Sequence, residues 1–264
     1  MELLSSLIFI CIGSLVGFLS GLLGIGGGII VVPALLVSFS YLGIVTDHSM
    51  QLATGTSLTA MVLTTSSSAW SHSKHHQINW SVFFTLIPGI LLGAACGGVI
   101  SHILPSAKVY LTFACFICLM GLYHLFPVRR TIEIDQPYNH GWLLTSGVGV
   151  VIGTLSSFFG IGGGIITVPL LNKLGMPLRN AISLSATTSF VIALAGALTF
   201  AYLGYHSKES IGYVHMPAFL CIGLSSIFTA WLGAKYARTL PMITLRRIFG
   251  SFMLAVGFAM FLFK

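Results

Sequence analysis

Two glycine runs carry the strongest chemical signal in this sequence. Residues 24–28 and residues 160–164 both read GIGGG. Glycine interrupts a helix and lets a ligand come close to the backbone, and a helix that restarts after such a run presents free N–H groups and the positive end of its dipole. Two restarting helices that face each other would bind a small anion without a buried Lys or Arg. The glycines predicted to form this site are Gly26, Gly27, Gly28, Gly162, Gly163 and Gly164.

Hydroxyl side chains are the second predicted part of the site. A hydroxyl can donate a hydrogen bond to an oxyanion without the desolvation cost of a buried charge. The residues predicted to line the site in this way are Thr56, Ser57, Thr188, Ser189, Ser20 and Ser156. The alternative is that these hydroxyls bond to neighbouring helices or to the carbonyl four residues earlier, which is the commoner role of Ser and Thr in membrane helices.

The glycine runs also have a purely structural interpretation. Small residues at regular spacing let membrane helices pack closely, with no ligand involved. Here, however, each run precedes a second, short helix with a proline in its first turns, Pro33 or Pro169, where a missing N–H costs little. Two near-identical copies of this arrangement favour a binding site.

The elements that position these residues belong to a membrane protein. Hydrophobic residues make up 56% of the 264 residues and charged residues only 6%, whereas a soluble domain carries about a quarter charged residues. Residues 3–46, 75–107 and 136–172 contain no Asp, Glu, Lys or Arg, and a spanning helix needs about 20 mostly apolar residues. We therefore expect an all-α polytopic membrane protein, with the lipid bilayer as its surroundings and no nucleic-acid partner.

The chain repeats itself. Residues 13–36 and 149–172 are identical at 14 of 24 positions, at an offset of 136. We predict a first membrane repeat at 1–127, a polar connecting loop at 128–141 and a second membrane repeat at 142–264. Each repeat is a Gly-broken helix pair followed by three spanning helices, expected near 49–70, 80–101 and 106–126, and near 181–204, 214–234 and 243–263. Internal duplication is a common construction of secondary transporters.

The repeats can be parallel or inverted. If the helix, the break and the short helix form one kinked crossing, each repeat crosses four times and the repeats are parallel. If they fold back as a re-entrant hairpin, each repeat crosses three times and the repeats are inverted. Of the 12 Lys and Arg residues, the parallel arrangement puts seven on one side and the inverted arrangement nine. Cytoplasmic loops hold the excess of Lys and Arg, so we predict inverted repeats in an inner membrane with both termini outside.

The motifs resemble those of a known family. A duplicated GxGGGxxxxP after a first helix, with the pairs Thr56-Ser57 and Thr188-Ser189 near the start of the next one, is similar to the TauE/SafE family of membrane permeases. The resemblance covers nearly the whole chain. It implies transport of an anion, often sulfite or a small organosulfonate. The segment from His48 to Ala53 departs from the repeat, since it matches its counterpart at 180–185 only weakly.

The predicted function is a permease that moves a small anion, such as sulfite or a related organosulfur oxyanion, by alternating access between the two repeats. No carboxylate lies inside a predicted span and no GKS or GKT loop is present, which argues against a buried carboxylate proton relay and against ATP-driven transport by this chain. We expect no enzymatic activity, catalytic residue, cofactor or metal site. The alternatives are a scaffold or channel subunit in which the breaks only pack helices, and a membrane enzyme, which would need a His pair inside the spans.

Overall fold

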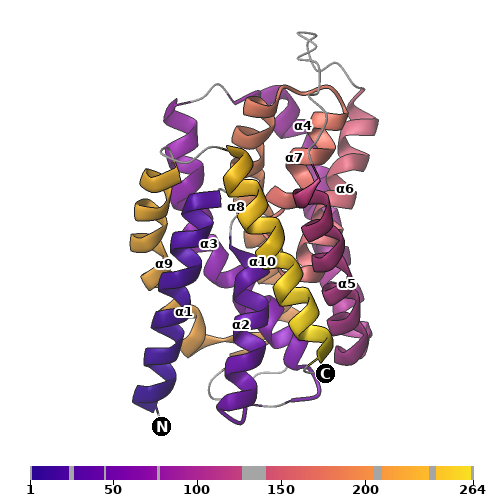
Figure 1. Ribbon diagram of the computed structural model, residues 1–264. Coiled ribbons are helices and arrows are strands. Elements are labelled where there is room, and N and C mark those ends of the chain that lie inside the picture. The colour runs from indigo at the N-terminus through magenta and orange to yellow at the C-terminus, as the bar shows by residue number, and fades with distance from the viewer. Residues whose placement is uncertain are drawn as a thin grey trace.

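The computed structural model describes residues 2–23, 27–44, 46–75, 78–126, 141–204, 210–237 and 242–262. These residues form a bundle of helices with one short hairpin (Figure 1). The elements are α1 (Glu2–Leu23), α2 (Gly28–Tyr41), α3 (Ser49–His75), α4 (Trp80–Ile103), α5 (Ser106–Leu125), α6 (Trp142–Phe159), α7 (Gly164–Lys173), α8 (Leu178–Leu203), β1 (Ser210–Ile211), β2 (Val214–His215), α9 (Met216–Ala237) and α10 (Met242–Leu262). The all-α polytopic fold is confirmed.

Each glycine run interrupts the helical chain, as predicted. α2 and α7 begin directly after Gly27 and Gly163, whose φ angles are 75° and 72°. These angles belong to the left-handed region, which glycine enters without a steric penalty. Pro33 and Pro169 lie inside α2 and α7, at the sixth residue of each helix rather than in its first turn. Their missing N–H groups therefore leave the carbonyls of Ile29 and Ile165 without the usual helical donor.

Helices from one half pack on helices from the other. α1 packs against α9, and α6 packs against α4 in the same way; α3 packs against α8 and α5 against α10. In the repeat, α6 to α10 are the counterparts of α1 to α5. The contact of α1 with α9 therefore corresponds to the contact of α6 with α4, as expected for two halves related by a two-fold axis. The two breaks are thereby brought together near the contact of α3 with α8.

Regularly spaced small residues allow the closest of these contacts. A Cβ atom at Gly17 would lie 2.6 Å from the Ser226 Cα on α9, and one at Gly93 would lie 2.2 Å from the Val150 carbonyl oxygen on α6. Gly13, Gly21, Gly89 and Gly97 make equivalent close approaches at four-residue spacing. Small-residue packing of the membrane type is thus present in the spanning helices, separate from the GIGGG runs.

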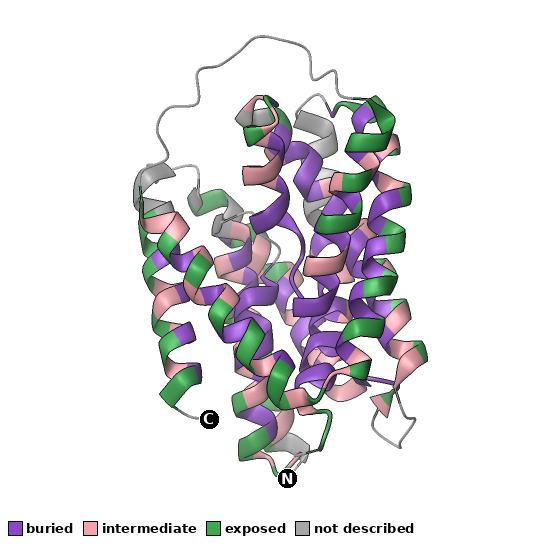
Figure 2. Ribbon diagram, turned by 90° about the vertical axis from the view of Figure 1, so that its right-hand side faces the viewer, coloured by how far each residue is buried: buried purple, intermediate pink, exposed green. Residues whose placement is uncertain are grey.

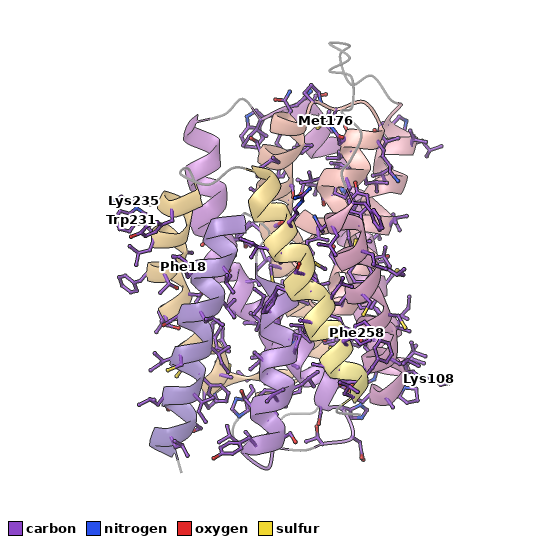
Figure 3. The ribbon with its side chains drawn as sticks, viewed as in Figure 1. Phe18, Lys108, Met176, Trp231, Lys235 and Phe258 are labelled. Carbon is purple, nitrogen blue, oxygen red and sulfur yellow. The ribbon has the colours of Figure 1, made fainter. Side chains whose placement is uncertain are left out.

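The directions of the helices bear on the two possible arrangements. In Figure 1, α1 begins and α10 ends at the lower end of the bundle, whereas α6 begins at the upper end. Figure 3 places Lys108, at the start of α5, at the lower end and Lys235, at the end of α9, towards the upper end. The parallel arrangement would put these two lysines on one side. Inverted repeats remain a prediction, and their support is weighed with the proposed function.

The exterior of the bundle is apolar. Side chains such as Leu15, Phe228 and Leu262 are between 59% and 79% exposed, and Figure 2 shows exposed residues on the outer faces of the helices and buried ones inside. Among the described residues, helices α1, α4, α5, α6, α8 and α9 are the six long and apolar enough to cross a membrane. α3 is as long as these but is rich in Ser and Thr, and its segment 50–58 is buried. The chain is a multi-pass membrane protein.

Candidate functional site

The second glycine break is the best-defined part of the predicted site. α6 ends at Phe159, its C-cap Gly160 has φ 70°, and α7 begins after Gly163. All residues from Phe158 to Thr167 are buried. Irregular backbone inside a bilayer is tolerated only where protein or a polar cavity covers it, and here protein covers it on all sides.

Two of the predicted hydroxyls hold this break in place. Ser57 Oγ on α3 donates to the carbonyl oxygen of Gly160 at 3.0 Å. Ser189 Oγ on α8 is hydrogen-bonded to the carbonyls of Gly162 and Ser185. Ser57 satisfies a carbonyl at the end of the interrupted helix, and Ser189 adds a second bond to the Gly162 carbonyl, so one residue from each half contacts the break.

Two further hydroxyls converge on Gly163. A Cβ atom placed on Gly163 would lie 3.4 Å from Ser156 Oγ and 3.5 Å from Thr167 Oγ1. Both side chains are 0% exposed, and neither hydroxyl has a hydrogen-bond partner within the described part of the chain. A buried hydroxyl without a partner costs about 1–3 kcal/mol. These two groups are therefore available to a ligand at the start of α7.

The backbone adds a donor at the same place. Ile166 and Thr167 already donate their N–H groups to the Gly163 carbonyl, and Gly164 donates to the Gly162 carbonyl. No hydrogen bond is found from the N–H of Ile165 to any described residue. The first turn of α7 thus offers an N–H group and the positive end of the helix dipole beside the two hydroxyls.

The first break approaches the second directly. A Cβ atom on Gly28 would lie 2.3 Å from the Gly160 carbonyl oxygen and 3.0 Å from the Ile161 Cα. At Gly27 the nearest neighbours are Val16 and Ser20, with Ser20 Oγ 3.4 Å from the Cβ position. Gly26 lies outside the described residues. The contact of Gly28 with Gly160 shows that the two breaks abut at the interface of the two halves.

A small cavity lies beside the first break. It is lined by Leu19, Ser20, Gly27, Ile29, Ile30, Ile165 and Phe249 and has a volume of about 10 Å³, which is room for about one water molecule. Its walls are apolar apart from Ser20 and the backbone. The cavity is too small for an oxyanion.

The hydroxyls of Thr56 and Thr188 bond to groups outside the breaks. Thr56 Oγ1 donates to the Leu52 carbonyl at 2.7 Å and accepts from the backbone N–H of His215 at 2.9 Å. Thr188 Oγ1 donates to the Ser185 carbonyl at 3.1 Å. Thr56 therefore links α3 to the hairpin that precedes α9, and Thr188 bonds within α8. These are the structural hydrogen bonds expected if the two hydroxyls do not bind a ligand.

That hairpin carries part of a cluster of titratable side chains. The hydroxyl of Tyr213 lies 2.9 Å from His102 Nδ1, and the His48 ring lies 5.5 Å from the Tyr213 ring. Burial raises the pKa of Tyr213, so its hydroxyl stays protonated while it is hydrogen-bonded to His102. The cluster ties α4 to the hairpin at the end of the bundle where α10 ends, and it does not reach the breaks.

Thr167 is the residue that the sequence analysis missed. A signal for it exists: between residues 24 and 33 the two copies read GIGGGIIVVP and GIGGGIITVP, so they differ only where Thr167 replaces Val31. Its importance depends on the unpartnered state of its hydroxyl, which only the structure reveals. The buried polar side chains of the described residues are Ser, Thr, Gln51 and His215, with no Lys, Arg, Asp or Glu among them.

The fold and the site together define a class of protein: a multi-pass helical membrane protein with two abutting helix breaks inside the bundle. The comparisons agree. The profile of the family described as Sulfite exporter TauE/SafE matches residues 9–260, and the chain belongs to this family. The resemblance found in the sequence is thereby confirmed.

Relatives of similar length support this assignment. A probable membrane transporter protein of Haemophilus influenzae is 34% identical over 97% of this chain and 98% of its own length. Similar proteins, also described as probable membrane transporter proteins, are 31% identical in Xylella fastidiosa and 29% identical in Methanocaldococcus jannaschii, each over 97% of this chain and 95% of the relative. No solved structure matches the chain.

Proposed function

We propose that the protein is an inner-membrane permease that moves a small anion, sulfite or a related organosulfur oxyanion, between the two glycine breaks. The observation that carries the proposal is the meeting of the breaks: Gly28 approaches Gly160 across the interface of the halves. An anion there would meet helix N-termini and hydroxyls, the groups that bind anions without a buried cation. The choice of a sulfur oxyanion rests on the family description.

The proposed mechanism is alternating access by two inverted repeats. Its support is the reciprocal packing of α1 on α9 and of α6 on α4, together with the opposite directions of α1 and α6 (Figure 1). Inverted repeats can exchange conformations, so that rocking one against the other exposes a fixed central site to each side in turn. The cavity of about 10 Å³ beside the first break fits a closed conformation in such a cycle.

The test is anion flux in liposomes containing the purified protein. We expect flux of labelled sulfite or methanesulfonate in protein-containing liposomes and none in empty ones. Gly27→Leu and Gly163→Leu should abolish it without preventing membrane insertion, because both glycines have a left-handed φ near 75° and 72° that a leucine adopts only with strain. Unchanged flux in both variants would favour a scaffold or channel subunit in which the breaks only pack helices.

A further inference from the structure

The two breaks are not equivalent. At the second break, Ser156 Oγ and Thr167 Oγ1 lie 3.4 Å and 3.5 Å from the Cβ position of Gly163. At the first break, the residue that corresponds to Thr167 is Val31, and the adjoining cavity is lined mostly by Ile, Leu and Phe side chains. Only Ser20, the counterpart of Ser156, is a polar side chain among those that line this cavity.

We infer that the protein binds one monovalent oxyanion at the start of α7, with Ser156 and Thr167 as its hydroxyl donors. This inference rests on the proposed function and assigns the anion to the second break. Ser156, Thr167 and the N–H of Ile165 are buried donors for which no bond within the described chain is found. A three-oxygen head such as a sulfonate group can accept from all three.

The charge of the substrate follows from the neutral surroundings. No Lys or Arg is among the buried described residues, so the positive end of α7, equivalent to about half a charge, and neutral donors must stabilise the anion alone. The cost of removing an ion from water rises with the square of its charge. The site therefore selects a monoanion such as a sulfonate over a dianion such as sulfate.

Ile192 controls access to the position. Its Cδ1 atom lies 2.5 Å from the Cβ position of Gly163, at the end of a flexible side chain on α8. The anion occupies the site when this methyl group turns aside. Movement of α8 against α7 would then couple binding to the exchange of conformations.

The experiment compares Thr167→Val and Ser156→Ala with the wild-type protein, using methanesulfonate and sulfate as probes of binding to the purified protein. Each variant removes one hydrogen bond to a charged ligand, so methanesulfonate affinity should fall roughly tenfold to a hundredfold. Sulfate should bind the wild-type protein more weakly than methanesulfonate. The ligand-free melting temperature of Thr167→Val should stay the same or rise, because the substitution removes an unpartnered buried hydroxyl.

Thr65→Val is the matched control. Thr65 is 2% exposed, and its Oγ1 donates to the Met61 carbonyl, so this variant should lose stability and keep its methanesulfonate affinity. Unchanged methanesulfonate affinity in both Thr167→Val and Ser156→Ala overturns the assignment of the anion to the second break. Equal affinity for sulfate and methanesulfonate overturns the monoanion selectivity. If the wild-type protein transports no anion, the proposed function itself fails.

Discussion

At the scale of single residues, the structure separates glycines that bend the chain from glycines that let helices touch. Gly163 has a left-handed φ and borders the Ser156 and Thr167 hydroxyls. Gly43 has nearly the same φ, 73°, with open space around its Cβ position. Substitutions at Gly163 and Gly43 can therefore be compared to separate the effect of backbone strain from the effect on the function of the break.

Gly163→Ala should abolish anion flux, whereas Gly43→Ala should preserve it. Each substitution places a Cβ in the left-handed region, at a cost of about 1–2 kcal/mol, so both variants should melt at lower temperature, and Gly163→Ala at a lower temperature than Gly43→Ala because its Cβ also meets Ile192 Cδ1 at 2.5 Å. Only at Gly163 does the new methyl group fill the space between two hydroxyls. The measurements are thermal unfolding in detergent and flux in liposomes; equal flux in the two variants would show that the break serves no binding role.

At the scale of elements, the contact between α4 and α6 depends on the absence of side chains. A Cβ on Gly93 would lie 2.2 Å from the Val150 carbonyl, and one on Gly153 would lie 2.4 Å from the Ile90 carbonyl. These neighbours are backbone atoms and cannot turn away. The same spacing on α1 holds it against α9, so the four helices form two matching pairs that join the halves.

Gly93→Ala should therefore separate α4 from α6 and destabilise the protein, despite the better helix propensity of alanine. We expect a lower melting temperature and a lower yield of monodisperse protein in detergent. Gly147→Ala is the control on the partner helix α6: its Cβ position has no neighbour within 4 Å, so this substitution should be neutral or slightly stabilising. Equal melting temperatures in the two variants would contradict the close backbone contact.

The helices were predictable, and much of the site was not. Apolar runs bounded by proline and polar residues predict spans at 80–101 and 106–126, and the structure has α4 at Trp80–Ile103 and α5 at Ser106–Leu125. The breaks followed from glycine alone. The hydrogen bond from Ser57 to Gly160 joins residues 103 positions apart, and such a pairing depends on how α3 packs on the other half. Hydroxyl roles within a helix likewise depend on rotamers that sequence spacing does not reveal.

At the scale of the whole molecule, the distribution of charge predicts the orientation in the membrane. Lys173, Lys235 and Arg247 lie at the end of α7, the end of α9 and near the start of α10. In the inverted arrangement these three positions share one face, and Lys108 at the start of α5 lies on the opposite face. Lys235 stands 5.8 Å from the Trp231 ring, an aromatic and basic pair of the kind that favours the membrane interface.

Lys108→Cys and Lys235→Cys, each in a chain with Cys11, Cys96, Cys115, Cys118 and Cys221 replaced by alanine, test this orientation. Both lysines are exposed, so a membrane-impermeant maleimide should reach either position from its own side. Because the face with more Lys and Arg is cytoplasmic, Lys108→Cys should be labelled in intact spheroplasts and Lys235→Cys only after permeabilisation. Labelling of both from outside would place the two lysines on one face, as parallel repeats require. The reverse pattern would keep the repeats inverted but turn the termini towards the cytoplasm.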